Sequence, residues 1–93
     1  MITSSLALSA IGDAYMELNQ PYDAISYYEK ASNSNPNNFT TPIILMKLGH
    51  AHESKGEYEE AAKAYERIKT EYPKSTEGGE AEKYIARAKA KVK

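Results

Sequence analysis

The sequence predicts an all-α protein, an α-solenoid of two helix-turn-helix units and a C-terminal capping helix, five helices in all. Two observations carry this prediction. The 93-residue chain matches itself at a shift of 37 residues, and a period of this length is typical of stacked helical repeats. Within each unit, apolar residues recur at helical spacing between short clusters of turn-forming residues.

The internal repeat sets the domain organisation. The pairs matched by the shift are Ile11 and Leu48, Gly12 and Gly49, Ala14 and Ala51, Ala24 and Ala61, Tyr28 and Tyr65, and Pro36 and Pro73. A second shift brings the tail, from Ile85 to Ala88, onto the start of the unit. We therefore expect one domain over residues 1–93, with repeat one at 5–38, repeat two at 42–75 and the capping helix at 78–92.

The first unit is predicted to contain two helices. Apolar residues recur at helical spacing from Leu8 to Leu18, and the Asn, Gln and Pro at 19–21 interrupt the pattern. A second run extends from Ala24 to Ala31 and ends in the loop 33–38, which is rich in Asn, Ser and Pro. Thr41 is expected to cap the next helix, with Pro42 in its first turn.

The second unit repeats this plan. Leu45, Leu48 and His52 follow helical spacing until Gly56, which is expected to supply a sharp turn. A second helix follows over residues 58–72. After Pro73, residues 74–79 are predicted to form the last loop, and the helical pattern of the closing helix is clear from residue 80 to residue 91.

These residues resemble the pattern of the tetratricopeptide repeat. In unit one the pattern is carried by Leu8, Ile11, Gly12, Tyr15, Ala24, Tyr28, Ala31 and Pro36; in unit two it is carried by Leu45, Leu48, Gly49, Ala61, Tyr65 and Pro73. Unit two departs from it with His52 in place of the Tyr and Ile68 in place of the second Ala. The period is longer than the usual length of about 34 residues, and this feature and the C-terminal sequence are similar to the C-terminal repeats of bacterial cell-envelope members.

The resemblance implies a protein-protein interaction module that binds a peptide or helix of a partner in a concave groove lined by the first helices. By register, the partner-binding positions are Ser9, Asp13, Met16, Glu17, Met46, His50, Glu53, Lys83 and Arg87. The methionines offer adaptable apolar contacts. The three acidic residues are expected to pair with basic side chains of the partner, and Lys83 and Arg87 with an acidic one.

One family subtype is not expected. The clamp that grips the C-terminal carboxylate of heat-shock chaperones uses Asn at the sixth position of the first helices. This chain has Ala10 and Lys47 there.

An alternative function is a structural or oligomerisation segment. Ile2, Leu6 and Leu8 lie where a preceding unit would pack, without a polar capping helix before them. We therefore expect either that the chain is a fragment of a longer array or that this N-terminal face pairs with a second copy. The two functions differ in whether the protein self-associates or captures a foreign protein.

Composition excludes several other classes. The net charge is −1, divided as −3 over residues 1–36, −1 over 37–79 and +3 over 80–93, so a nucleic-acid partner is not expected. His50 and His52 are two residues apart and point to different sides of a helix, so no metal site and no cofactor is predicted. No catalytic motif is present, and we expect no enzymatic activity.

No apolar stretch of this chain is expected to insert into a membrane. Without cysteine, the compartment stays open between cytoplasm and periplasm, and the chain could belong to a membrane-anchored protein.

Overall fold

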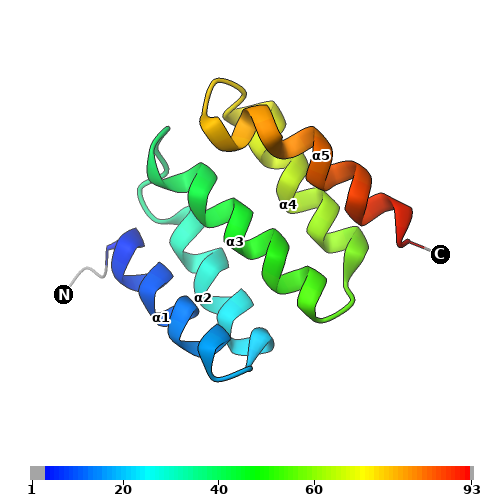
Figure 1. Cartoon of the computed structure of the whole chain (residues 1–93). Coiled ribbons are helices and arrows are strands. Elements are labelled where there is room, and N and C mark those ends of the chain that lie inside the picture. Colours follow the sequence, from blue (N-terminus) through cyan, green and yellow to red (C-terminus); the bar gives the residue numbers. More distant parts are fainter. Residues whose placement is uncertain (1–3, 93) are drawn as a thin grey trace.

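The computed structural model describes residues 4–92, and these residues form five α-helices joined by short connections. The helices are α1 (Ser5–Glu17), α2 (Pro21–Asn33), α3 (Thr40–Ser54), α4 (Tyr58–Glu71) and α5 (Thr76–Ala90). Figure 1 shows them side by side in two layers, with α1, α3 and α5 in one layer and α2 and α4 in the other. The predicted all-α fold of two helix pairs and a closing helix is confirmed.

Each helix packs mainly on its neighbours in the sequence, and α3 also contacts α1 and α5 within its own layer. The assembly is thin, with extents of 41 × 30 × 16 Å. The core is correspondingly a row of buried side chains along the layer boundary, among them Tyr28, Leu45, Tyr65 and Ile68. The middle of the row is the most completely enclosed part of the molecule.

Two glycines allow the helices of each pair to approach closely. A Cβ built on Gly12 would lie 2.6 Å from Cε1 of Tyr28, and one on Gly49 would lie 2.2 Å from Cε1 of Tyr65. Both tyrosines are buried. The aromatic ring of the second helix therefore occupies the space that any larger residue at the glycine would need.

The turns inside the two pairs have the same backbone geometry. Asn19 (φ 58°) and Gly56 (φ 75°) occupy equivalent positions of the repeat and both adopt the left-handed conformation, which Gly and Asn tolerate best. Pro21 follows as the first residue of α2, where its missing N–H costs nothing. The two predicted breaks are confirmed.

The predicted cap of α3 is wrong. The helix begins at Thr40, and the carboxamide oxygen of Asn37 accepts the N–H groups of Phe39 and Thr40 at 2.9 and 2.8 Å. Thr41 is buried inside the first turn, and its hydroxyl accepts the N–H of Asn37 at 2.8 Å. These reciprocal bonds satisfy donors at the helix start, as a capping box does.

The predicted start of α5 is also wrong, because the helix begins at Thr76 and includes both glycines assigned to the loop. Ser75 caps it by accepting the N–H of Gly78 at 2.9 Å. A Cβ on Gly78 would lie 2.2 Å from the carbonyl oxygen of Tyr72. This glycine permits a close helix-to-backbone contact and does not mark a loop. The helix ends at Ala90, before the predicted 92.

Candidate functional site

The candidate site is the face formed by α1, α3 and α5, which we call the odd-helix face. Side chains from these helices meet across two junctions, α1 with α3 and α3 with α5. At each junction a tyrosine from the second layer reaches between the helices with its hydroxyl. The polar contacts around these hydroxyls determine which charged side chains on the face are already paired within the chain and which are available to a ligand.

At the first junction, Asp13 is held by two groups of the same chain. The hydroxyl of Tyr28 donates to one carboxylate oxygen, and Lys47 Nζ lies 2.9 Å from the other. Partial burial raises the pKa of Asp13, but these hydrogen bonds outweigh it and keep the carboxyl pKa below its usual value. Burial and the hydrogen bond to Asp13 raise the pKa of Tyr28.

At the second junction, Glu53 is also held by a tyrosine hydroxyl and a cation of the same chain. It accepts hydrogen bonds from the hydroxyl of Tyr65 and from two nitrogens of Arg87, with Nε at 3.2 Å. Its side chain is only 12% exposed. Burial raises the pKa of Glu53, but the bonds from Arg87 and Tyr65 outweigh it and lower the pKa overall.

An aromatic cluster surrounds this second junction. The His50 ring lies edge-on to Tyr65 and Tyr84, with ring centroids 5.7 and 5.3 Å apart, and its Nδ1 is 2.8 Å from the Tyr65 hydroxyl. Tyr84 is half-buried, and Lys83 Nζ and the Arg87 guanidinium carbon lie 4.9 and 4.7 Å from its ring centroid. The contacts fix these long side chains in position.

The structure brings most of the predicted groove residues to this face, but one is misplaced. Ser9 is only 4% exposed, and its hydroxyl lies 3.4 Å from Lys47 Nζ between α1 and α3. It cannot be a free contact residue because α3 covers it. Its position in the repeat predicted a groove residue. That prediction did not take into account that the long side chain of Lys47 extends from α3 to Ser9.

The other predicted residues divide into three groups. Met16 and Met46 are half-buried and pack against the core. His50 and Glu17 are exposed, and so are Lys83 and Arg87. Asp13 and Glu53, predicted to pair with basic side chains of a partner, already have cationic partners in Lys47 and Arg87. A basic ligand would have to displace those side chains.

Sequence reasoning missed three contributors: Lys47, Tyr84 and the tyrosine hydroxyls. Lys47 and Tyr84 occupy the same position of successive repeats. In the sequence this position served only to compare the chain with the chaperone-binding clamp. The repeat pattern gives Tyr28 and Tyr65 as matched positions, without a role for their hydroxyls. The presence of Tyr at this position in both repeats, Tyr28 and Tyr65, was the available signal, since a buried hydroxyl usually has a hydrogen-bond partner.

No group of three or more His, Cys, Asp or Glu side chains in residues 4–92 has the arrangement of a metal site. His52 is buried, with its Nδ1 2.8 Å from Glu57 Oε1. Among the described helices, none combines the length and apolar character needed to cross a membrane.

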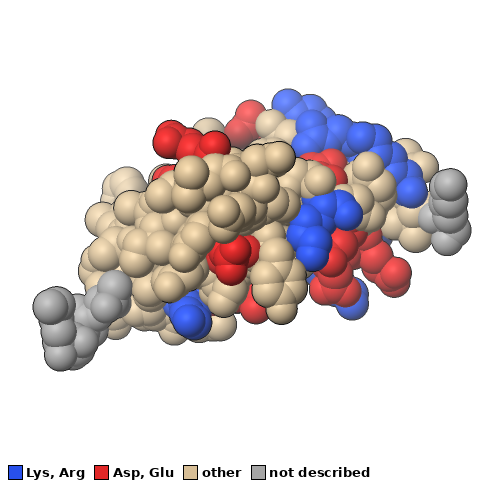
Figure 2. All heavy atoms as spheres, turned by 90° about the horizontal axis from the view of Figure 1, so that it is seen from below, with Lys and Arg blue, Asp and Glu red and all other residues tan. Residues whose placement is uncertain are grey.

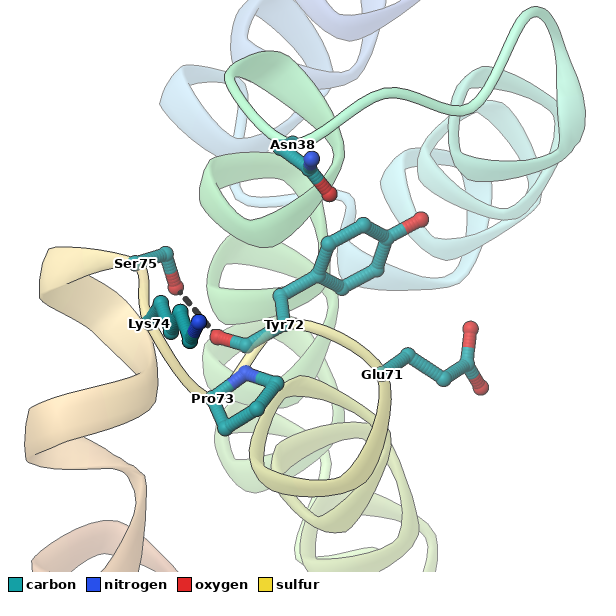
Figure 3. A pocket seen from close by; sticks show the side chains of 6 residues that line it. All are labelled: Asn38, Glu71, Tyr72, Pro73, Lys74 and Ser75. Carbon is teal, nitrogen blue, oxygen red and sulfur yellow. Dashed lines mark hydrogen bonds between the residues drawn. The ribbon is translucent and has the colours of Figure 1, made fainter.

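A cavity of about 270 Å³ lies away from the odd-helix face, between the α2–α3 loop and the α4–α5 turn. Its lining residues are Asn38, Glu71, Tyr72, Pro73, Lys74 and Ser75. Figure 3 shows the Tyr72 ring extending toward the α2–α3 loop, while Ser75 donates a 2.7 Å hydrogen bond to the Tyr72 carbonyl. No predicted groove residue lines this cavity. The hydrogen bond between Ser75 and Tyr72 in its wall belongs to the α4–α5 turn.

A family model described as tetratricopeptide repeat matches residues 9–76. No curated protein and no solved structure gives a significant match to the chain.

Proposed function

The chain belongs to the tetratricopeptide-repeat family, whose repeats are in general non-catalytic protein-interaction modules, and from this membership we propose that it is an adaptor. It binds a peptide or helix of a partner protein against the odd-helix face and catalyses no reaction. The observation that carries the proposal is the assembly at α3 and α5 of accessible side chains held in place before any ligand arrives.

The chemistry of this face suits protein recognition. His50 and Arg87 are exposed, and contacts with the half-buried Tyr84 restrict both. Aromatic and arginine side chains dominate the energetics of protein interfaces, and prior ordering reduces the entropy lost on binding. Met46 adds an apolar surface that adapts to the shape of a ligand.

A capture experiment tests this proposal. The immobilised chain is exposed to lysate of its source cell beside a double variant, Met46→Ala with His50→Ala. The control is Lys63→Ala on α4, which leaves the odd-helix face unchanged. We expect a protein retained by the native chain and the control, and lost with the double variant at equal helix content by circular dichroism. Equal retention by all three would contradict the assignment of the face.

A second function is favoured by the outer side of α1. Its exposed apolar residues are Leu6 and Leu18, each 64% exposed, Ile11 at 39%, and Ala7, Ala10 and Ala14. The repeat equivalents of Ile11 are Leu48 and Ile85, which are 5% and 6% exposed because α2 and α4 cover them. An uncovered stripe of this kind is a self-association surface, and we propose pairing of two copies through it as the alternative.

This alternative rests on other residues than those predicted. Leu8 is half-buried and packs against the core, so it offers less exposed surface than Leu6. Ile2 lies outside the described residues. Sedimentation equilibrium of the native chain and of Ile11→Glu tests the pairing. A concentration-dependent dimer that Ile11→Glu abolishes supports it, whereas a monomeric native chain at all concentrations removes it.

A further inference from the structure

A row of cations runs along α5. Lys83, Arg87 and Lys91, the C-cap residue of α5, are four residues apart, so they follow one another along one side of the helix, and all three are exposed. Figure 2 shows a run of Lys and Arg atoms along the upper side near the C-terminal end of the molecule, with Asp and Glu atoms below it, while most of the N-terminal part of the same view is neither acidic nor basic. The positive charge that the sequence concentrates after residue 80 is therefore also concentrated in space.

The row is held in place by aromatic rings beneath it. Lys83 and Arg87 share the ring of Tyr84, and Lys91 Nζ lies 5.3 Å from the ring centroid of Tyr58 on α4. Such contacts favour extended, ordered cations over freely rotating ones. Two of the three cations, Lys83 and Lys91, have no carboxylate within 4 Å among residues 4–92.

The two lysines of α4 differ in this respect. Lys63 pairs with Glu60, and Lys69 on α4 pairs with Glu82 on α5. Their charge is already compensated locally. Among the cations of α4 and α5, including Lys91 at the C-cap of α5, those without a carboxylate of the described residues within 4 Å therefore lie on the α5 row.

Arg87 also keeps binding capacity although it pairs with Glu53. A guanidinium carries five N–H donors, and Glu53 accepts from Nε and one terminal nitrogen. The remaining donors stay available to a second carboxylate. Glu53 is the less exposed member of the pair, with 12% of its side chain exposed against 45% for Arg87, so an approaching ligand meets the cation first.

We infer that the α5 row is the docking site for an acidic segment of a partner protein, whose carboxylates contact Lys83, Arg87 and Lys91. This inference rests on the proposed adaptor function and specifies its partner class. It reverses the expected role of the acidic residues: Asp13 and Glu53 hold the helices together, and the ligand's charge is negative. A helix with carboxylates four residues apart matches the spacing of the row.

A nucleic-acid ligand fits the row less well. The three cations span about 12 Å of helix, whereas proteins that bind nucleic acid typically neutralise about six to ten phosphates. Glu82 on α5 and Glu53, which reaches α5 from α3, would repel a continuous phosphate backbone. Discrete carboxylates between apolar residues avoid that repulsion.

The test uses a fluorescein-labelled, Ala-rich helical peptide with Glu at positions 1, 5 and 9, and a matched peptide with Lys at those positions. Fluorescence anisotropy with the full chain compares the native protein, the double variant Lys83→Glu with Lys91→Glu, and a control variant Lys63→Glu with Lys69→Glu. The two variants change the net charge equally. Arg87 is left intact because it also holds Glu53.

We expect the Glu peptide to bind the native chain in preference to the Lys peptide, with affinity that falls as salt rises. The row variant should lose about tenfold or more in affinity and the control about twofold or less. Equal binding of the Glu peptide to native chain and row variant, preference for the Lys peptide, or no binding would overturn the inference. So would a mixed-sequence single-stranded oligonucleotide that binds the row more tightly than the Glu peptide at the same salt.

Failure of this inference is distinguishable from failure of the adaptor proposal. A partner captured from lysate whose binding survives reversal of Lys83 and Lys91, yet is lost with Met46→Ala and His50→Ala, would leave the adaptor standing and remove the acidic docking site.

Discussion

At the scale of single residues, Gly49 is a position where one added carbon would meet a buried side chain. Alanine normally stabilises a helix interior by about 1 kcal/mol relative to glycine. Here the new Cβ would lie 2.2 Å from the Tyr65 ring, which is buried and hydrogen-bonded through its hydroxyl. We expect Gly49→Ala to lower the free energy of unfolding by about 1–3 kcal/mol, the usual cost of overpacking, as measured by urea denaturation.

Gly79 provides the matched control for Gly49→Ala. It also lies inside a helix, but a Cβ there meets nothing within 4 Å. Gly79→Ala should therefore raise the free energy of unfolding by about 0.5–1 kcal/mol. If Gly49→Ala lowers the free energy of unfolding and Gly79→Ala raises it, then packing against Tyr65, not helix propensity, is the reason that the repeat has glycine at position 49. Stabilisation by both would show that the Tyr65 ring moves aside.

Glu53 gives a pH-dependent prediction. Its pKa is lowered in the folded state, so its stabilising contribution is present above its unfolded pKa of about 4.3 and is lost as pH falls through the folded value. Glu53→Gln should be about 1–2 kcal/mol less stable than the native chain at pH 7. The difference should shrink as pH falls from 5 to 2 in urea denaturation.

The control for Glu53→Gln is Glu80→Gln, an exposed position of α5 beyond its first turn and without an ion pair among the described residues. Its stability should follow that of the native chain at every pH. A constant difference between Glu53→Gln and the native chain down to pH 2 would show that the carboxylate charge is not what Arg87 and Tyr65 stabilise.

The residues at the two junctions show where sequence reasoning stopped. Register placed Asp13 and Glu53 on the odd-helix face, because repeat position fixes which side of a helix a residue occupies. It could not show that Lys47 and Arg87 neutralise them, because those contacts depend on the distance and angle between helices 34 residues apart in the chain. Ser9 was misassigned for the same reason.

At the scale of helices, the start of α3 depends on the side chain of Asn37, which caps its first turn. Asn37 accepts two N–H groups of the first turn, which would otherwise lack partners. Asn37→Ala should lower the free energy of unfolding by about 1 kcal/mol. Asn38→Ala is the control, since the described residues offer its side chain no hydrogen bond, and it should change stability little. Equal effects of the two substitutions would mean that the loop, not the cap, is being perturbed.

Helix existence was predictable here, and helix ends were not. Apolar spacing and the repeat fixed all five helices, and Pro21 and Gly56 marked two boundaries correctly. Gly78 misled because the same residue type serves a loop and a close helix contact, and only the position of the Tyr72 carbonyl distinguishes them. Thr41 and Asn37 are both suitable caps by composition, and the backbone path decides between them.

At the scale of the whole molecule, the 37-residue period determines how stability is distributed. Each helix is covered by its chain neighbours, so the terminal helices have a neighbour on one side only. The contrast is large: α3 has eight buried residues, whereas α1 has two, Ser9 and Gly12. At the other end, α5 presents a charged outer surface, whereas α1 presents the apolar stripe around Ile11.

This uneven burial predicts a gradient in amide hydrogen exchange. Amides of α3 and α4 should be protected most strongly, because opening them exposes the core, and those of α1 should exchange through local fraying at much lower free energy. The measurement is native-state exchange by NMR at two protein concentrations, with Ile11→Glu as the control. If α1 frays alone, its protection is low and the same at both concentrations. If two copies pair through the stripe, its protection rises with concentration and Ile11→Glu removes the rise. Protection of α1 equal to that of α3 at every concentration would contradict the nearest-neighbour account, because nothing in the described chain covers that side of the helix.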